Sequence, residues 1–196
     1  MLYGRNFELQ KRLSVARFRE ALEKNLVDED IISLLEEINS MESYFTTSSC
    51  SGRIVVMEIP DFGDKLNARW LGKWHREVSV GEVKEVITRH NDGMLWFMLH
   101  SPILHVGAKT LKDAVNLLNL AIQCGFKNSN IKSISHKKLL VEIYSTERMD
   151  IPIGKDGEVW VDDGYLEKIV GIANRQLRRA KEKLRRLENE LKKLRY

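Results

Sequence analysis

The chain has 196 residues, of which 43% are hydrophobic and 31% are charged, and its formal net charge at neutral pH is +4. This composition is that of a folded globular protein and excludes an intrinsically disordered chain. No apolar run is long enough to cross a bilayer, and the N-terminus lacks the apolar core of a signal peptide. We therefore expect a cytoplasmic protein that has no membrane partner.

The two cysteines and five histidines do not form a metal-binding pattern. Cys50 and Cys124 are far apart in the sequence and neither belongs to a CxxC pair. The histidines are scattered, without the spacing of metal ligands. We expect two free thiols, since a cytoplasmic compartment disfavours a disulfide, and no metal site.

Two helices are predicted at the start of the chain. Residues 5–24 place apolar side chains at helical spacing and predict an amphipathic helix. Asp28 is expected to be the N-cap of a second helix. Ile31, Ile32, Leu35 and Ile38 form its apolar face.

An uninterrupted run of small hydroxyl or thiol residues follows at positions 46–51. It does not suit a core strand, because a buried hydroxyl without a partner costs about 1–3 kcal/mol. We predict a hairpin that turns at Ser51-Gly52, with a second strand over residues 53–59. Clustered hydroxyls and backbone N–H groups, with the bidentate guanidinium of Arg53, suit a bound anion. A plain serine-rich hairpin with a surface arginine is the alternative.

The middle of the chain predicts a loop and then two similar units. Residues 60–66 have turn chemistry without periodicity and predict the loop. Each unit is a strand, a helix and a strand, over residues 69–75, 79–90 and 94–99, and then 103–106, 110–123 and 131–135. A histidine precedes each helix cap by four or five residues, at His75 and His105. We treat this as a weak internal duplication.

The chain is predicted to end in one long helix after further strands at residues 139–145 and 157–161. Asp162 or Asp163 caps this helix, and its leucines follow a heptad spacing. Residues 175–196 contain ten Lys or Arg and three Glu. Two interpretations remain open: an arm that binds nucleic-acid phosphates, or a helix that packs within the chain or in a coiled-coil homodimer.

Several common motifs are absent. The sequence contains no GxG, no GxxxxGK[ST] and no HExxH. This excludes the dinucleotide-binding fingerprint, the glycine-rich loop of common methyltransferases, the P-loop and the zincin motif. It does not exclude nucleotide binding by another kind of site.

The segment Phe45-Thr46-Thr47-Ser48-Ser49-Cys50-Ser51-Gly52-Arg53-Ile54 resembles the signature of the tRNA wybutosine-synthesizing protein 3 family. Further residues agree with the family in order and spacing over roughly residues 28–176. They are Trp70 and His75, Pro102 to Val106, Gly125 to Ser129, Ser145-Thr146 with Pro152, Tyr165, and Ala173-Asn174. The basic heptad tail is not part of this pattern.

The resemblance implies an S-adenosylmethionine-dependent tRNA methyltransferase of wybutosine biosynthesis. Its expected substrate is N4 of a tricyclic wyosine precursor beside the anticodon of phenylalanine tRNA, and which precursor is methylated stays open. The implied fold is not Rossmann-like, in agreement with the missing GxG. A non-catalytic RNA- or anion-binding module is the alternative.

The expected fold is α+β: one domain with a mixed sheet and flanking helices, plus the long C-terminal helix. Residues 1–176 are expected to form the catalytic domain. Residues 177–196 are expected to form a basic helical extension of the same domain, and this helix could also join two copies of the chain in a homodimer. Arg53, His75 and His105 are the catalytic candidates. Each histidine is expected to act as the general base or to form a hydrogen bond with the tricyclic nucleobase that accepts the methyl group. A core histidine is the alternative for each. The candidates for binding the substrate or S-adenosylmethionine are Thr47, Ser48, Ser49, Ser51, Gly52, Trp70, Asn128, Ser129 and Ser145.

Overall fold

The computed structural model describes residues 6–60, 64, 66–135 and 138–194. Most of the loop predicted at residues 60–66, His136 and the ends of the first and last predicted helices lie outside these residues. The chain forms two compact units. The first contains the residues up to Ser51, then Pro102–Thr146, and the residues from Lys181 onward; the second contains Gly52–Ser101 and Glu147–Ala180.

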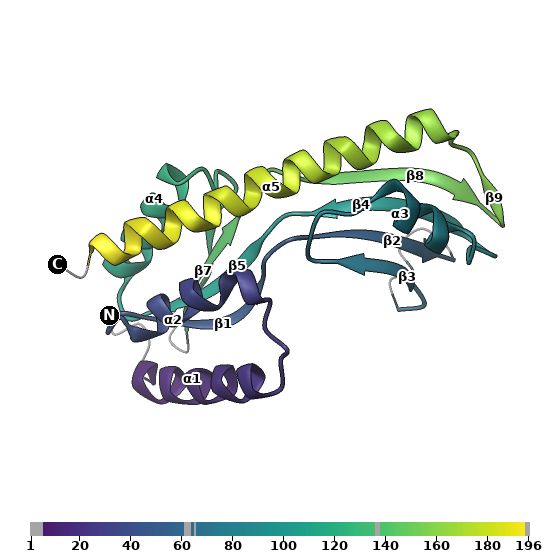
Figure 1. Ribbon diagram of the computed structural model, residues 1–196. Coiled ribbons are helices and arrows are strands. Elements are labelled where there is room, and N and C mark those ends of the chain that lie inside the picture. The colour runs from purple at the N-terminus through teal and green to yellow at the C-terminus, as the bar shows by residue number, and fades with distance from the viewer. Residues whose placement is uncertain (1–5, 61–63, 65, 136–137, 195–196) are drawn as a thin grey trace. The chain divides into compact units, whose positions relative to one another are not determined.

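The first unit is built on a four-stranded sheet in the order β1-β5-β7-β6. The strands are β1 (Tyr44–Cys50), β5 (Ile103–Ala108), β7 (Leu139–Tyr144) and β6 (Asn130–Ile134). The helices are α1 (Phe7–Glu23), α2 (Ile32–Ser40, after a short 3-10 turn at Glu29–Ile31), α4 (Leu111–Gln123) and the last part of α5 (Asp163–Lys193) (Figure 1).

The core of the first unit lies on one face of this sheet. Alternate residues of β5 and β7 enter it, because successive side chains of a strand point to opposite faces. Leu104, Val106, Val141 and Ile143 therefore pack with buried side chains of α2, α4 and α5. The residues between them, among them His105 and Glu142, belong to the opposite face.

The second unit contains a five-stranded sheet in the order β3-β2-β4-β8-β9. Its strands are β3 (Arg69–Trp74), β2 (Arg53–Ile59), β4 (Met94–His100), β8 (Met149–Lys155) and β9 (Glu158–Val159), and its helices are α3 (Val80–Ile87) and the first part of α5. Ile54, Val56, Leu95 and Phe97 from this sheet pack with Val83 of α3 and with apolar residues of α5.

The serine-rich hairpin is a wrong prediction. β1 pairs with β5, where Cys50 lies opposite Ile103, whereas β2 pairs with β3 and β4. The two strands belong to different sheets, and the division between the units falls between Ser51 and Gly52. Gly52 has a φ of 88°, a conformation that favours glycine, and it is the first residue of the second unit.

The two predicted strand-helix-strand units are confirmed as β3-α3-β4 and β5-α4-β6. A capping box begins each helix, with Ser79 and Glu82 in α3 and Thr110 and Asp113 in α4. Asp28 does not cap α2 with its side chain; its Oδ2 accepts the backbone N–H of Ser51 at 2.7 Å instead.

Strand β8 was not predicted, because Pro152 and the charged residues before it disfavour a strand. Proline is tolerated here because β9 pairs only with Gly154 and Lys155, so Pro152 lies on a part of β8 that β9 does not cover.

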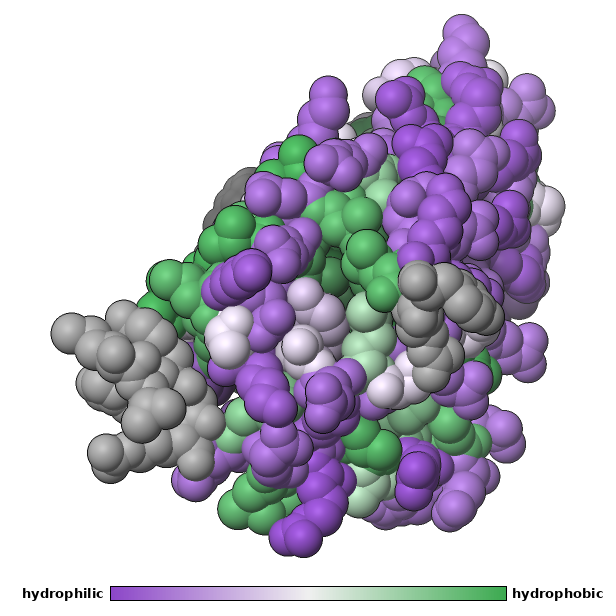
Figure 2. All heavy atoms as spheres, turned by 90° about the vertical axis from the view of Figure 1, so that its left-hand side faces the viewer, coloured by the Kyte–Doolittle hydropathy of each residue, from purple (hydrophilic) through white to green (hydrophobic). Residues whose placement is uncertain are grey.

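The α+β class, the absence of a Rossmann-like fold and the long C-terminal helix are confirmed. One mixed sheet was expected, and this is wrong: the strands form two sheets, and each strand pair that the structure describes is antiparallel. Cys50 and Cys124 are not joined in a disulfide, as predicted. No helix in the described part of the chain is long and apolar enough to cross a membrane. Polar and charged side chains cover much of the face in Figure 2, with smaller apolar areas between them.

Helix α5 packs within the chain through its heptad leucines. Leu184, Leu187 and Leu191 are at most 3% exposed and belong to the core of the first unit, while Leu177 belongs to the core of the second. This confirms the intramolecular interpretation. The seam expected to form a homodimer is occupied by the chain itself, and only Leu194, at 62% exposed, extends it toward solvent.

Some basic side chains of α5 are also paired within their own unit. Lys181 contacts Asp30 in the first unit. Arg178 binds Glu77 in the second through two nitrogens, at 3.0 and 2.6 Å. Pairing of this kind reduces the positive charge that an RNA-binding arm has available.

We expect Leu187→Ala to lower the free energy of unfolding by about 2–5 kcal/mol, because it leaves a cavity in the first unit. Leu194→Ala, at the exposed residue directly after the same helix, is the control and is expected to change it by less than about 0.5 kcal/mol. Urea unfolding followed by circular dichroism measures both. Equal stability of the two variants would show that the leucines do not form the core described here.

Candidate functional site

A cavity of about 380 Å³ lies in the first unit between α1 and β1. Hydroxyl side chains from Thr46 to Ser49 line one side of it, and α1 contributes Ser14 and Arg17. The apolar part consists of Phe18, Ala21, Leu26 and Val27. Its volume is within the usual range of small-molecule sites, about 300–1,000 Å³, and it combines apolar surface with a few polar groups, as such sites do.

A β-bulge in β1 explains why consecutive hydroxyl residues are accessible. Thr46 lies opposite Val106 and Ser48 opposite His105, so Thr47 is an extra residue in β1. Its Oγ1 donates to the carbonyl oxygen of His105 at 3.3 Å. β1 is also an edge strand, and Thr47, Ser48 and Ser49 are all exposed. These three hydroxyl groups therefore avoid the cost of burial.

Behind Ser48, a polar network crosses the whole sheet of the first unit. The Oγ of Ser48 lies 2.7 Å from Nδ1 of His105, and Nε2 of His105 lies 2.6 Å from Oε2 of Glu142. Lys132 binds the same carboxylate, and its Nζ lies 3.1 Å from Nε2 of His105. The residues come from β1, β5, β7 and β6, which are successive neighbours in the sheet. His105 lies inside β5.

Glu142 is held in its charged form by this network. Its partial burial raises the pKa, but hydrogen bonds from Lys132, His105 and Asn130 outweigh that effect and lower the pKa to about 2. Glu142 is thus a carboxylate at neutral pH and can stabilise positive charge on His105.

Arg17 is the cation of the cavity. It is exposed, and among the residues that the structure describes it makes no hydrogen bond or ion pair. A guanidinium beside several hydroxyls is suited to binding a carboxylate or phosphate. The sequence gives no signal for Arg17, one of several basic residues in the predicted first helix. Glu142 does leave a signal, since it is a single charge within the apolar run of β7.

Four of the predicted site residues lie in the second unit: Gly52, Arg53, Trp70 and His75. The Nε of Arg53 donates to Nδ1 of His100 at 3.3 Å, and its guanidinium lies 4.8 Å from the centre of the Trp70 ring. Burial, and next the charge of Arg53, lowers the pKa of His100. Trp70 is 45% exposed, so this stacked pair is accessible from solvent. His75 directly follows β3 and is half-buried.

The remaining predicted residues have defined surroundings in the first unit. Asn128 is exposed in the turn after α4, and the Oγ of Ser129 accepts the backbone N–H of Tyr144 at 3.2 Å. Ser51 and Ser145 are fully buried. The Oγ of Ser145 accepts a hydrogen bond from Lys183 at 2.9 Å. The structure thus brings Thr47, Ser48 and Ser49 to one cavity with His105 behind them, and places the other four residues elsewhere in the unit.

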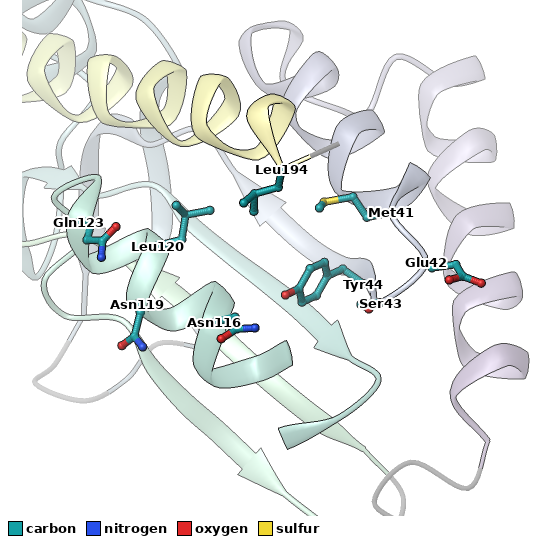
Figure 3. A pocket seen from close by; sticks show the side chains of 9 residues that line it. All are labelled: Met41, Glu42, Ser43, Tyr44, Asn116, Asn119, Leu120, Gln123 and Leu194. Atoms are coloured by element: carbon teal, nitrogen blue, oxygen red, sulfur yellow. The ribbon is translucent and has the colours of Figure 1, made fainter. Parts of the chain in front are cut away.

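A second cavity of about 390 Å³ in the first unit is different in chemistry (Figure 3). The α4 side chains Asn116, Asn119 and Gln123 contribute carboxamides to it, and Leu194 reaches it from the end of α5. Among the described residues that line it, there is no arginine, lysine or histidine and none of the predicted site residues. Because the two volumes are nearly equal, the polar network is what favours the cavity at β1 as the functional site.

Comparison with known proteins gives consistent results. The model of the family described as Methyltransferase TYW3 matches residues 7–193. A protein of Thermococcus sibiricus named tRNA(Phe) 7-((3-amino-3-carboxypropyl)-4-demethylwyosine(37)-N(4))-methyltransferase is 69% identical over 193 residues, which are 98% of each chain. A Thermococcus kodakarensis protein with the same name, numbered 1, is 64% identical over 98% of each chain. The structure of the PH1069 protein from Pyrococcus horikoshii superposes with a TM-score of 0.94, at 64% identity, over 97% of this chain and 98% of that one.

We expect the Glu142 carboxylate to titrate with a midpoint at about pH 2, below its ordinary value of 4.5. Lys132→Met removes the largest stabilising hydrogen bond and should move the midpoint upward. Because folding lowers this pKa, ionised Glu142 stabilises the fold above the ordinary value, and this contribution is lost as the pH falls toward about 2. Carbon-13 NMR of the side-chain carboxylates measures both midpoints. A midpoint near 4.5 in the unsubstituted protein would mean that the network does not form in solution.

Proposed function

This chain belongs to the methyltransferase TYW3 family, and on that premise we propose that it methylates N4 of 7-(3-amino-3-carboxypropyl)-4-demethylwyosine at position 37 of tRNA(Phe), with S-adenosylmethionine as the methyl donor. The observation that carries the proposal is the match to the family over residues 7–193, together with 69% identity to an enzyme named for this reaction. These relatives are named as enzymes, so a non-catalytic RNA- or anion-binding module is not favoured. Action on tRNA supports the expectation that the protein is cytoplasmic.

Positioning is the main task in this reaction. S-adenosylmethionine supplies an activated methyl group on a sulfonium, and the acceptor nitrogen has to lie about 3–3.5 Å from the methyl carbon, in line with the bond that breaks. The acceptor nitrogen also carries a proton that has to leave when the methyl group is added. A general base near this proton contributes about 10²–10⁴ to the rate.

The cavity between α1 and β1 suits the tricyclic base and its side chain. Phe18, Leu26 and Val27 offer apolar surface to the rings. The 3-amino-3-carboxypropyl group ends in a carboxylate, and Arg17 is the unpaired cation in this cavity. We infer that Arg17 binds that carboxylate through its two-nitrogen fork and so favours the aminocarboxypropyl form of the precursor over simpler tricyclic bases.

The other predicted residues are proposed to contact the RNA or the donor. The Arg53–Trp70 pair offers a guanidinium and an exposed aromatic face, which suit a phosphate or carboxylate and a nucleobase respectively. Thr47 and Ser49 offer hydroxyls, and Asn128 an exposed carboxamide. Gly52, His75 and Ser129 are proposed in the same roles on the basis of the family signature. Ser51 and Ser145 are fully buried, so their proposed role is to position neighbouring residues of the site. Within the second unit, the stacked Arg53 and Trp70 suit the carboxylate and the adenine of the donor without a glycine-rich loop.

The function is tested by incubating the protein with S-adenosylmethionine and tRNA(Phe) that carries the aminocarboxypropyl-demethylwyosine precursor. Mass spectrometry of the nucleosides should show one added methyl group on the tricyclic base, located at N4 by fragmentation. Precursor tRNA that stays unmethylated at saturating protein and donor would refute the proposal.

Arg17→Ala is expected to raise KM for this precursor tRNA about tenfold to a hundredfold with a smaller change in kcat, because a charge-assisted hydrogen bond contributes about 1.5–3 kcal/mol. Arg12→Ala, on the exposed surface of the same helix but outside the cavity, is the control. With tRNA whose tricyclic base lacks the aminocarboxypropyl group, Arg17→Ala and the unsubstituted enzyme should have the same KM. An equal loss on both substrates would show that Arg17 does not recognise the carboxylate.

A further inference from the structure

Ser48 stands between the cavity and the polar network of the first unit. Its Oγ is bonded to Nδ1 of His105, and the same side chain lines the cavity between α1 and β1. His105 itself is not among the residues that line this cavity. The hydroxyl of Ser48 therefore links the imidazole of His105 to a molecule bound there.

We propose that Ser48 and His105 form a proton relay that removes the proton of the acceptor nitrogen, and that Glu142 and Lys132 position His105 and set its charge. This inference rests on the proposed methyl transfer, and it adds a route for the proton and two positioning residues to it.

The tautomer of His105 follows from its two contacts. Glu142 is ionised, so a distance of 2.6 Å between its Oε2 and Nε2 of His105 requires a hydrogen between them, because two lone pairs would repel each other. Lys132 already has the carboxylate of Glu142 as its acceptor. Neutral His105 thus holds its hydrogen on Nε2, and Nδ1 accepts the hydrogen of Ser48 at 2.7 Å.

This arrangement leaves the lone pairs of Ser48 Oγ as its free hydrogen-bonding groups, so that Ser48 acts as an acceptor for an N–H in the cavity. In the reaction, the bond from the acceptor nitrogen to the methyl carbon forms as the sulfur–carbon bond of the donor breaks. The proton of the nitrogen moves to Ser48 Oγ, and the hydroxyl hydrogen of Ser48 moves to Nδ1 of His105. The products are the methylated base, S-adenosylhomocysteine and the imidazolium of His105, which later releases its proton to solvent.

The charged groups around His105 act on that imidazolium in opposite directions. Glu142 on β7 stabilises it, and Lys132 on β6, with its Nζ 3.1 Å from Nε2, destabilises it. β1 contributes the uncharged hydroxyls of Ser48 and Thr47, and α1 contributes Arg17 at the cavity. A purely structural cluster would hold the strands together without any dependence of the reaction on these opposite charges.

The relay is tested by single-turnover methyl transfer at saturating tRNA and donor, measured as a function of pH. Ser48→Ala should lower the rate about 10²–10⁴-fold, with the Kd for tRNA within threefold of the unsubstituted value. Loss of the anion in Glu142→Gln makes protonation of His105 harder and should move the acid limb of the profile to lower pH. Loss of the cation in Lys132→Met should move the acid limb to higher pH.

Glu20→Gln and Lys24→Met are matched controls, since these residues form an exposed Glu–Lys pair at the C-terminal end of α1 that does not line the cavity. They should leave the profile unchanged. Melting curves show whether each variant folds. Acid limbs that shift in the same direction in the Glu142 and Lys132 variants, or that do not shift, would overturn the relay, as would a Ser48→Ala enzyme with full rate.

A second measurement does not depend on activity. Nitrogen-15 NMR of the histidine side chains in the unsubstituted protein should show the Nε2–H tautomer of neutral His105, and the Nδ1–H tautomer would overturn the relay. The outcomes separate the two proposals. An unsubstituted enzyme that does not methylate the precursor refutes the function and the relay together, whereas an active enzyme that is insensitive to Ser48→Ala refutes the relay alone.

Discussion

The antiparallel pairing of β1 with β5 is the contact on which the candidate site depends, because it places Ser48 directly opposite His105. The next pairing, of β5 with β7, places His105 opposite Glu142 in the same way. Facing residues of neighbouring strands are close enough for their side chains to bond. A shift of one residue in either register would turn His105 or Glu142 into the core, which is occupied by Leu104, Val106 and Val141. The apolar packing on one face thereby fixes the polar geometry on the other.

Helix α5 supports this arrangement from the opposite face of the first unit. Its leucines complete the core under β5 and β7, while its earlier residues do the same for the second unit. A heptad pattern alone does not distinguish a coiled-coil partner from a sheet of the same chain, because both accept an apolar stripe along a helix. In this protein the stripe is buried against the chain itself, and the basic residues between the leucines lie on the remaining faces of the helix, several of them paired with carboxylates.

The candidate site stabilises the ionised form of the Glu142 side chain relative to its neutral form. Glu142 is held as a carboxylate by hydrogen bonds from Lys132, His105 and Asn130, and the ammonium of Lys132 also lies close to Nε2 of His105. Such an arrangement balances one negative against one positive charge beside an imidazole that can accept a proton. The Ser48 hydroxyl passes the effect to the cavity, where Arg17 supplies the charge that suits an anionic substrate group.

The sequence by itself determined the α+β class, both strand-helix-strand units with their capping residues, the long last helix and, through the signature at residues 45–54, the family. These follow from local signals: apolar periodicity, caps and a residue run specific enough to be recognised. The tertiary structure alone decided that the serine-rich strand leaves β2 and pairs with β5, that Pro152 lies within a strand, and that Arg17, Lys132 and Glu142 belong to the site. Strand partners and cross-strand neighbours depend on contacts between residues far apart in the chain, and no local pattern encodes which of the compatible pairings has the lowest free energy.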